Sequence, residues 1–457
     1  MEIEVKSEDI DHIQTAFNEI PFYKKYYPML KDKTHASDPM LYATMQFNLG
    51  MSLENAWVES ELGIVRPSTA FIIIERSGSS KTLALDIAKT VRTELSHSPI
   101  YHIQKFEHWT PEGVKSFLAN LSGEEKQKLY RIALFRDEAT TLIKQMKRDS
   151  SEQHEFLNDL IDGRVEQHDT RTSGHETMPE QIKCDVLVAG TPPFWRHATS
   201  DWWDTGTGYR LFYPPEGKPD FRGIRMNGSS FAQFSEFTTY LKTLPSITKF
   251  EYTPEFDTRY YSITEQNRVK LFGTNENPIA VYRTKFPVLI LKLAMIHKAA
   301  MMEKPKAIPI PNSMSQENYL LLDTDDLEWA VKDFEYYSRG FGRAYDSFID
   351  AQSDNFKPKT TKDSETQFFS KLDKIKEHYE IHHESDPEFS TNSILVAEKS
   401  ETGEWYTRTA LNSLLQWSGE TWDAITGKLI KENKIEMCHP VWIKGTRHKD
   451  SYLYRIM

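Results

Sequence analysis

Cysteine is scarce in this sequence, which has only Cys184 and Cys438, far apart along the chain. This argues against a disulfide framework and a cysteine-based zinc site, and it favours a reducing compartment. Long apolar runs are missing as well, since none approaches the ~20 residues that cross a bilayer. The sequence begins with acidic residues and lacks the apolar stretch of a secretory signal. We therefore expect a cytoplasmic protein with no membrane partner.

Basic residues are not in excess either. Lys and Arg number 56 against 67 Asp and Glu, which gives a formal net charge of −11. A basic surplus would have favoured nucleic acid directly, so the overall charge counts weakly against DNA binding. Local placement matters more than the sum, because a few basic loops can line a channel while the outer faces stay acidic. The 457 residues suffice for two or three domains.

The pattern of apolar residues divides the chain into segments. Residues 1–64 have helical spacing, residues 65–215 alternate short apolar runs with polar helical stretches, and residues 216–350 turn helical. The polar residues 351–365 are typical of a linker, and residues 366–457 form a compact tail of helices and short strands. In the α/β segment, strands are expected at residues 70–74, 100–103, 132–135 and 186–189.

A loop at residues 75–82 follows the first of these strands and precedes a helical stretch. A phosphate-binding loop needs this order, because exposed amides and a helix N-terminus must point at the phosphates. In the pattern G-x-x-x-x-G-K-[ST], Lys81 would neutralise the β- and γ-phosphates and Thr82 would hold Mg²⁺. Glu75 and Ser80 replace the two glycines, whereas Gly78 remains in the turn.

The sequence therefore predicts an ATP site. The expected nucleotide-binding residues are Ser77, Gly78, Ser79, Ser80, Lys81 and Thr82. The alternative interpretation is an ordinary Ser/Gly-rich loop before a helix that Ser79 or Ser80 caps.

Polar side chains end two further strands. Asp137 and Glu138 close the run at 132–135, where the first carboxylate would orient the Mg²⁺ shell and the second would polarise the attacking water. Acidic pairs at strand ends are also common as solvated loop residues. Thr191 follows the run at 186–189 and would position the water, although Thr-Pro-Pro is also a routine strand exit. The order of the three motifs favours an ATPase.

This order resembles the AAA+ superfamily, and within it the minichromosome maintenance (MCM) helicases and the MCM-like ATPases of plasmids, phages and integrated elements. MCM-type phosphate loops also accept a small residue other than glycine before the lysine, and Ser80 is such a residue here. Residues 155–162 are similar to the helix after the acidic pair, residues 163–175 to the hairpin before sensor 1, and residues 189–192 to the sensor 1 strand end. The resemblance covers roughly residues 40–345.

The resemblance implies further site residues. Residues 203–212 are similar to the stretch that ends in an arginine finger, which makes Arg210 that finger, and residues 283–297 resemble the lid helix, with Lys292 at the sensor 2 position and Lys285 as a second basic residue. A finger acts on the nucleotide of a neighbouring subunit, so a homo-oligomeric ring is implied. Two departures imply a slow or partner-dependent ATPase: Glu75 brings negative charge near the phosphates, and Lys292 lacks the bidentate fork of arginine.

DNA contacts are expected in two places. The hairpin carries Arg164, His168 and Arg171, which could grip phosphates in a channel, although a solvated mixed-charge loop is the alternative. The tail has the layout of a winged helix, which is also used for protein docking. Its expected phosphate-contacting residues are Arg408, Lys428, Lys431, Lys444, Arg447 and Lys449.

Together these features predict an α/β P-loop NTPase core of AAA+ type, with a helical N-terminal segment, a helical lid and a C-terminal winged-helix domain. The expected protein is a Mg-ATP-dependent motor on single- or double-stranded DNA, a replicative helicase or replication initiator of a mobile element. Replication proteins are expected as further partners. Two alternatives stay open: an ATP-binding scaffold with little hydrolysis that docks partners or DNA through its tail, and a DNA-binding regulator with a vestigial core.

Overall fold

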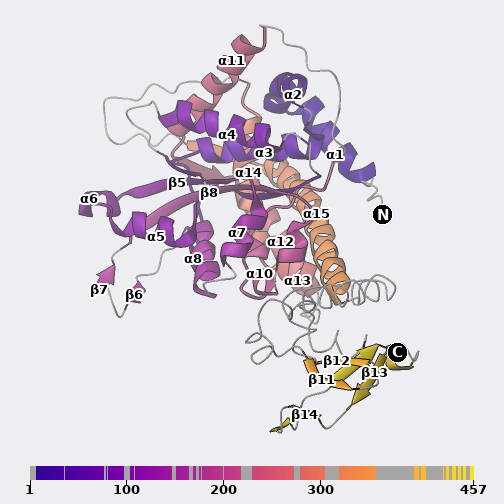
Figure 1. Cartoon of the computed structure of the whole chain (residues 1–457). Helices are drawn as coiled ribbons and strands as arrows, with labels where there is room; N and C mark the ends of the chain where they lie inside the picture. Colours follow the sequence, from indigo (N-terminus) through magenta and orange to yellow (C-terminus); the bar gives the residue numbers. More distant parts are fainter. Residues whose placement is uncertain are drawn as a thin grey trace. The chain divides into compact units, whose positions relative to one another are not determined.

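A computed structural model of the chain divides into two compact units, residues 1–349 and residues 350–457 (Figure 1). The structure describes residues 7–34, 36–76, 79, 81–96, 103–107, 109–146, 151–163, 168–170, 174–176, 178–198, 200–217, 229–271, 278–303, 319–356, 396–400, 403–407, 426, 429–431, 435–438, 441–443, 446–448 and 453–456.

The centre of the first unit is a four-stranded parallel sheet. Its order is β3 (Ala70–Ile74), β8 (Gln181–Gly190), β5 (Leu129–Arg136) and β4 (Gln104–Glu107). The continuous apolar run of β3 suits a parallel sheet, whose strands are covered on both faces. Next to β3 on its other side, Phe212 accepts a hydrogen bond from the Ile72 N–H (3.1 Å) and donates its own N–H to the Ala70 carbonyl (2.7 Å).

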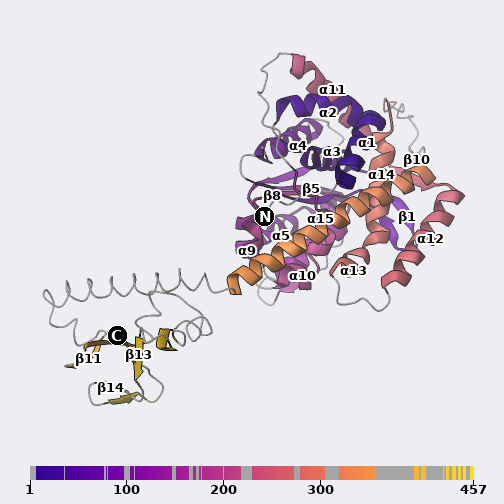
Figure 2. The same cartoon turned by 90° about the vertical axis from the view of Figure 1, so that its right-hand side faces the viewer.

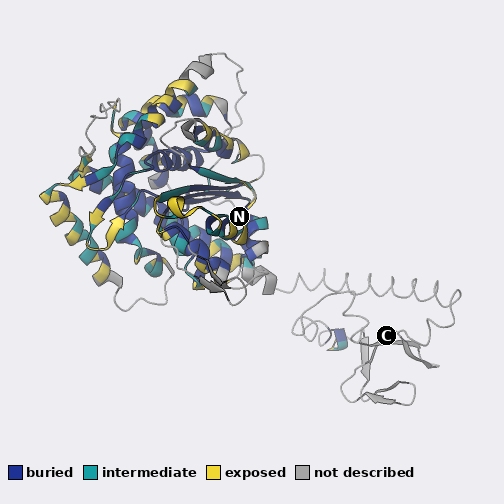
Figure 3. Cartoon of the chain, turned by 90° about the vertical axis from the view of Figure 1, so that its left-hand side faces the viewer, coloured by how far each residue is buried: buried dark blue, intermediate teal, exposed yellow. Residues whose placement is uncertain are grey.

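Helices cover both faces of this sheet, so β3 and β8 and most of β5 are buried, whereas the edge strand β4 is half-buried (Figures 1 and 3). On one face lie α3 (Asp38–Ser52), α4 (Lys81–Ser96) and α11 (Ser229–Thr243). On the other lie α7 (Ala139–Met146), α8 (Ser151–Asp162), α9 (Phe194–His197) and α10 (Asp201–Asp204). The chain crosses through α4 from β3 to the far edge at β4 and then returns through β5 to β8. Because such crossovers are right-handed, this reversal places the connecting helices on opposite faces.

The N-terminal helices belong to this same unit. They are α1 (Ser7–Glu19), α2 (Pro21–Lys33) and α3. Ser37 caps α3 by accepting a hydrogen bond from the Met40 N–H, and a proline follows at the first turn, which is a regular helix start. α3 is buried almost throughout, between the sheet and the other two helices, so this helical part of the expected N-terminal segment belongs to the core packing. The segment is not helical to its end, because strands occupy Val58–Ser60 and Gly63–Val65.

A second, smaller sheet joins segments that are far apart in the sequence. Its order is β10 (Tyr319–Leu322), β9 (Lys249–Tyr252), β1 (Val58–Ser60) and β2 (Gly63–Val65). β9 is parallel to both β1 and β10, and β1 and β2 form a hairpin. The segment 216–350, which we expected to turn helical, is mostly helical where the structure describes it, but it also contains the strands β9 and β10. Both strands are short, and β9 finds a partner in β1, outside the segment.

The chain on either side of β10 is helical and forms α12 (Pro254–Leu271), the short α13 (Pro278–Arg283), α14 (Phe286–Ala300) and the long α15 (Thr324–Phe356) (Figure 2). Of these, α14 packs against β10 and β2. α15 is tied to the N-terminal helices through the buried Asp333. Its carboxylate accepts hydrogen bonds from Tyr42 (2.7 Å) and Gln46 (2.8 Å) and lies 2.8 Å from His12 Nε2. No helix in the described ranges is long and apolar enough to span a membrane.

Short elements complete the first unit. They are α5 (Pro111–Ala119), α6 (Gly123–Lys126), β6 (His168–Thr170), β7 (Gly174–Glu176) and the 3₁₀ turns Gly208–Arg210 and Leu244–Ser246. β6 and β7 pair antiparallel inside the hairpin expected at 163–177. The strand expected at 100–103 lies later, at β4. Ile103 is a buried loop residue, and residues 100–102 fall outside the described ranges.

The second unit contains an antiparallel sheet and a separate hairpin. The sheet order is β11 (Val396–Ser400), β12 (Gly403–Thr407), β16 (Leu453–Ile456) and β13 (Ile435–Cys438), and the hairpin joins β14 (Val441–Ile443) to β15 (Thr446–His448). The helices expected in this tail lie mostly in residues that the structure does not describe. The winged helix stays a prediction, as does the lid.

Candidate functional site

Three of the predicted motifs leave the central sheet at the same edge. Ile74 at the end of β3 pairs with Gly190 at the end of β8, and Arg136 at the end of β5 pairs with Val188. The loop at 75–82, the acidic pair and Thr191 therefore all start at the carboxyl edge. Because β8 lies between β3 and β5, and neighbouring strands are about 4.8 Å apart, β3 and β5 lie about 10 Å from each other.

This edge has the topology of a ligand site. The connection after β3 runs through α4 on one face, and the connection after β8 runs through α9 and α10 on the other. In open α/β sheets, ligands bind in the crevice where neighbouring strands send their connections to opposite faces. Here that crevice lies between β3 and β8, directly at the loop that the sequence predicts to bind phosphate.

Gly190 is the point where these segments meet. A Cβ atom added to it would lie 2.8 Å from the Ala139 Cβ and 3.0 Å from the Ile74 Cδ1. Ala139 follows Glu138 directly, and Ile74 precedes Glu75 directly. The end of β3 and the start of α7 thus both pack against this glycine, and a side chain there would push them apart.

Within the loop, Lys81 folds back over the preceding backbone. Its ammonium group donates to the carbonyls of Glu75 (2.9 Å) and Arg76 (2.6 Å) and to the Ser79 Oγ (3.2 Å). Partial burial lowers the pKa of Lys81, and the nearby carboxylates of Glu75 and Glu216 oppose this. A lysine at the first position of α4, held against the turn, places positive charge where a phosphate-binding loop needs it.

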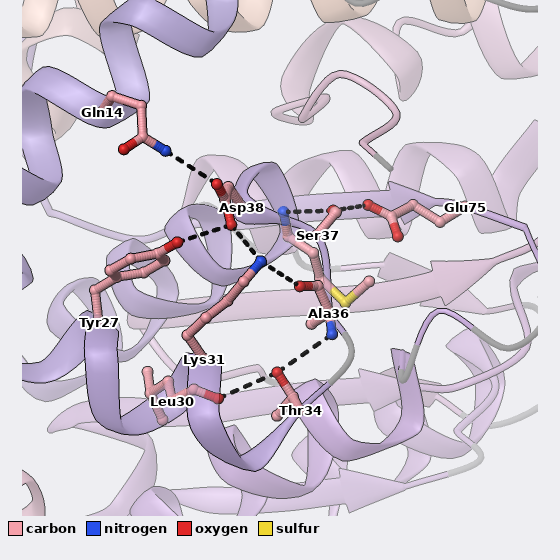
Figure 4. A network of polar contacts seen from close by, with 10 residues as sticks. Gln14, Tyr27, Leu30, Lys31, Thr34, Ala36, Ser37, Asp38 and Glu75 are labelled. Carbon is pink, nitrogen blue, oxygen red and sulfur yellow. Dashed lines mark hydrogen bonds and ion pairs between the residues drawn. The ribbon is translucent and has the colours of Figure 1, made fainter. Parts of the chain in front are cut away.

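The Glu75 side chain is buried beside the loop, within reach of Ser37 before α3 and of Ser79 in the loop itself. It is only 2% exposed, and its carboxylate accepts a hydrogen bond from the Ser37 hydroxyl at the N-cap of α3 (Figure 4). Burial raises the pKa of Glu75 to about 7, against the effect of hydrogen bonds to Ser37, Ser79 and the Gly217 N–H. The carboxyl that was expected to add negative charge near the phosphates is thus buried, and its raised pKa weakens that charge near neutral pH.

Ser37 also links the loop to the outer helices. The next residue, Asp38, accepts hydrogen bonds from Lys31 (2.6 Å) and Tyr27 (2.9 Å) of α2 and from Gln14 (3.0 Å) of α1 (Figure 4). Glu75, the first residue of the loop, is thus connected through Ser37 and Asp38 to α3, α2 and α1.

The acidic pair and Thr191 are accessible at the same edge. Asp137 is partly buried and Glu138 is exposed. Arg136 lies close enough that both carboxylates influence its pKa, which burial lowers. The Thr191 carbonyl accepts the Phe194 N–H (2.8 Å) and starts α9. Thr82 is exposed at the start of α4. Two hydroxyls, two carboxylates and an ammonium group form the kind of donor set that binds a metal-complexed triphosphate.

Arg210 lies at the opposite, amino edge of the sheet. Because Phe212 pairs next to Ala70, Arg210 lies roughly 15–20 Å from its own phosphate loop at about 3.3 Å per residue. Its guanidinium bonds Asp162 through Nε (3.0 Å) and Nη2 (2.9 Å), and Nη1 donates to the Gly206 carbonyl (3.0 Å).

Lys292, the predicted sensor 2 residue, and the second basic residue Lys285 line the same cavity as Arg210. This cavity of about 460 Å³ is lined by Arg66, Arg210, Lys285, Lys292 and Asp162. Lys292 is buried in α14, and burial lowers its pKa, whereas Asp162 and Asp185 raise it. The structure therefore gathers Arg210, Lys285 and Lys292 in one place and keeps them apart from the loop of the same chain.

The remaining predicted residues cannot be placed in detail. Ser77, Gly78, Ser80, Arg164, Arg171, Arg408, Lys428, Lys444 and Lys449 lie outside the described ranges. His168 and Arg447 lie on β6 and β15, and Lys431 is exposed on a short helical turn. Sequence reasoning missed Ser37, Gly190 and Asp162. The Ser-Asp-Pro start of α3 signals a helix N-cap, but no local pattern indicates its bond to Glu75.

No protein-family model and no curated protein matches the chain. Among solved structures, a full-length MCM homolog from Methanopyrus kandleri matches with a TM-score of 0.35 and 10% sequence identity. The match covers 74% of this chain and 63% of that homolog, so the chain spans less than two thirds of its length. A similarity this distant carries no argument about function. The described architecture itself is a mixed α/β fold whose parallel sheet is compatible with a P-loop-type core.

Proposed function

We propose that this protein is a Mg-ATP-dependent AAA+ motor that acts on DNA, as a replicative helicase or replication initiator of a mobile element. The observation that carries the proposal is the convergence on Gly190. The phosphate loop, the acidic pair and Thr191 leave three adjacent strands at one edge, at the topological switch point of the sheet.

Each residue at this edge has a role that suits its chemistry. Lys81 and the amides of residues 77–80 would hold the phosphates, and Thr82 with Asp137 would hold Mg²⁺. Glu138 is the exposed carboxylate and would accept the proton of the attacking water, with Thr191 orienting that water. Bound Mg-ATP would supply the transferable phosphoryl group and the metal charge that neutralises it.

The second cluster supports a homo-oligomeric assembly, with a ring as the expected form. Arg210, Lys285 and Lys292 line one cavity at the amino edge, too far from their own loop to assist it. Presented to the nucleotide of a neighbouring subunit, such a cluster would stabilise charge in the transition state. The hairpin and the second unit would then contact DNA through the basic residues named above, and replication proteins would dock on the assembly.

The direct test compares ATP turnover, with and without single-stranded DNA, in the wild-type protein and in Lys81→Ala and Glu138→Gln. Lys81→Ala is expected to lose nucleotide binding, and Glu138→Gln to bind nucleotide but lose turnover. Lys144→Ala and Glu155→Gln, at exposed positions on α7 and α8, serve as matched controls. Solution mass with and without Mg-ATP and DNA should show a nucleotide-dependent assembly.

Three outcomes would count against the motor. Turnover that Glu138→Gln leaves unchanged would overturn the assignment of the acidic pair. Nucleotide binding without turnover in the wild-type protein would favour an ATP-binding scaffold. Absence of nucleotide binding in every protein would favour a DNA-binding regulator.

A further inference from the structure

A groove on the first unit, separate from the nucleotide edge, has no role in the proposed motor chemistry. It lies between α12, the β1–β2 turn and the first turns of α14, and its volume is about 910 Å³. This is within the range of pockets that hold ligands of substantial size. Its walls combine aromatic rings with carboxylates, chiefly Tyr252, Phe256, Tyr260, Tyr261, Glu61 and Asp257.

The aromatic wall is an ordered ladder. Tyr252 stacks on Phe256 with ring centroids 5.8 Å apart, and Phe256 stacks on Tyr260 at 6.2 Å with an interplanar angle of 11°. Phe256 and Tyr260 are four residues apart on one face of α12, and Tyr252 extends the row from the end of β9. At the rim, Tyr261 is 64% exposed and Leu62 is 54% exposed. Large apolar side chains gathered at a hollow on the surface are typical of an interaction site.

The groove has a net negative charge, because its two arginines are paired with glutamates and two further carboxylates are not paired with any described residue. Arg268 forms two bonds with Glu265 (2.9 and 2.5 Å), and Arg283 bonds Glu335 (2.6 Å), so these two arginines are already neutralised. Neither Glu61 nor Asp257 has a side-chain hydrogen bond or ion pair with any residue that the structure describes.

The two carboxylates act on the aromatic wall. Burial, followed by the charges of Asp257, Glu59 and Glu61, raises the pKa of Tyr252, and burial followed by Glu61 raises the pKa of Tyr260. The groove therefore offers π faces beside uncompensated negative charge. A cation is attracted by both features, because an aromatic face and a carboxylate each stabilise positive charge.

We propose that this groove binds a basic peptide segment of a partner protein, with an apolar side chain against the aromatic ladder and Lys or Arg side chains over Tyr252 and Tyr261, directed at Glu61 and Asp257. A nucleic acid fits less well, because its phosphates would face the two carboxylates without a free arginine to meet them. Buried aromatic anchors with charged residues at the rim are also the usual source of affinity in peptide interfaces. The proposal does not depend on ATP turnover.

The test uses the full chain and a fluorescein-labelled 12-residue peptide of alternating Lys and Leu, with a Glu and Leu peptide as its charge-reversed counterpart. Binding is measured by fluorescence anisotropy at two salt concentrations. Tyr261→Ala and Asp257→Asn are each expected to weaken binding of the Lys-Leu peptide about tenfold. Matched controls are Tyr319→Ala, an exposed tyrosine outside the groove, and Glu255→Gln, a carboxylate on the same helix outside it. These controls should change binding less than twofold.

Location is checked with the same peptide carrying a photo-reactive phenylalanine at a central position, followed by mass spectrometry. Cross-links to residues 252–268 or to the β1–β2 turn would support the proposal. Lack of binding by the wild-type protein, equal loss in the control variants, or cross-links elsewhere would overturn it. So would a 12-nucleotide single strand that competes for the groove, or self-association of the chain that Tyr261→Ala abolishes, since these would identify a different occupant.

Discussion

The Ser37 hydroxyl donates a hydrogen bond to the Glu75 carboxylate, which joins the N-cap of α3 to the first residue of the predicted phosphate loop. The same hydroxyl oxygen accepts the Met40 N–H, so one small side chain serves both a helix start and a buried acid. Where the standard phosphate loop has its first glycine, this chain has Glu75, whose carboxyl is held by the Ser37 hydroxyl. The geometry of the loop therefore depends on Ser37, roughly 40 positions earlier in the sequence, as well as on the turn within the loop.

Glu75→Gln should change the pH dependence of stability. The pKa of Glu75 is about 7 in the folded protein against an ordinary 4.5, so its contribution to stability is fully present below pH 4.5 and is lost as the pH rises to 7. The loss is on the order of 3 kcal/mol. The amide stays neutral and still offers an oxygen to Ser37, so Glu75→Gln should equal the wild type near pH 4.5 and exceed it above pH 7.

The measurement is the denaturant midpoint between pH 4.5 and pH 8.5. Burial also raises the pKa of Glu54 to about 7, but Glu54 is present in both proteins, so the difference between them reports Glu75 alone. Parallel pH curves for the two proteins would contradict the prediction. Ser37→Ala should destabilise the protein by about 1–2 kcal/mol through loss of the α3 cap.

Gly190→Ala should disturb the site more than the fold. The added methyl group would lie 2.8 Å from the Ala139 Cβ and 3.0 Å from the Ile74 Cδ1, which forces the loop strand and the acidic pair apart. We expect a loss of about 1–3 kcal/mol of stability, as for other overpacked sites, together with weaker binding of labelled ATP. Gly123→Ala is the control, because a Cβ there has no neighbour within 4 Å. Unchanged nucleotide binding in Gly190→Ala would argue against a site at this edge.

Arg210→Ala and Lys81→Ala should each be inactive alone but regain turnover when mixed. In a mixed assembly, some sites combine the intact loop of an Arg210→Ala subunit with the intact arginine of a Lys81→Ala subunit. Loss of the finger is expected to lower turnover about 10³-fold or more in the single variant. A mixture of Lys81→Ala with Glu138→Gln is the control, because both changes damage the same side of the site and every site stays broken. Failure of the first mixture to recover would show that Arg210 has no role between subunits.

Asp333→Asn should weaken the attachment of α15 to the N-terminal helices. The amide nitrogen cannot accept the bonds that the carboxylate receives from Tyr42, Gln46 and His12. The expected cost is about 2–4 kcal/mol, because buried donors are left without acceptors. Urea denaturation measures it, with the exposed Asp346→Asn on the same helix as control. A loss no greater than that of the control would mean that the contacts are dispensable.

Local patterns in the sequence predicted the central strands well. The run at 70–74 coincides with β3, and the runs at 132–135 and 186–189 lie within β5 and β8. Continuous apolar runs are a strong signal because these strands are buried on both faces. Their carboxyl ends could be identified from the polar residues that follow, so the candidate site was recognisable before its geometry was known.

Contacts between distant segments were not predictable in this way. Periodicity does not report that β9 pairs with β1, that Glu75 turns towards Ser37, or that Arg210 pairs with Asp162. Each depends on how the chain folds back after many residues. β9 and β10 are also only four residues long, too short for a period of two to stand out within a helical segment.

The strands of the sheet β10-β9-β1-β2 are synthesised at very different times, because they lie far apart in the sequence. Its hairpin, Val58–Ser60 with Gly63–Val65, emerges early, but Lys249–Tyr252 and Tyr319–Leu322 emerge only after most of the first unit has been made. At about 5–20 residues per second, roughly 10–40 s separate the appearance of β1 from that of its partner β9. Until β9 appears, β1 has an unpaired edge that can pair with another chain, so a nascent chain within this interval exposes a strand that favours aggregation.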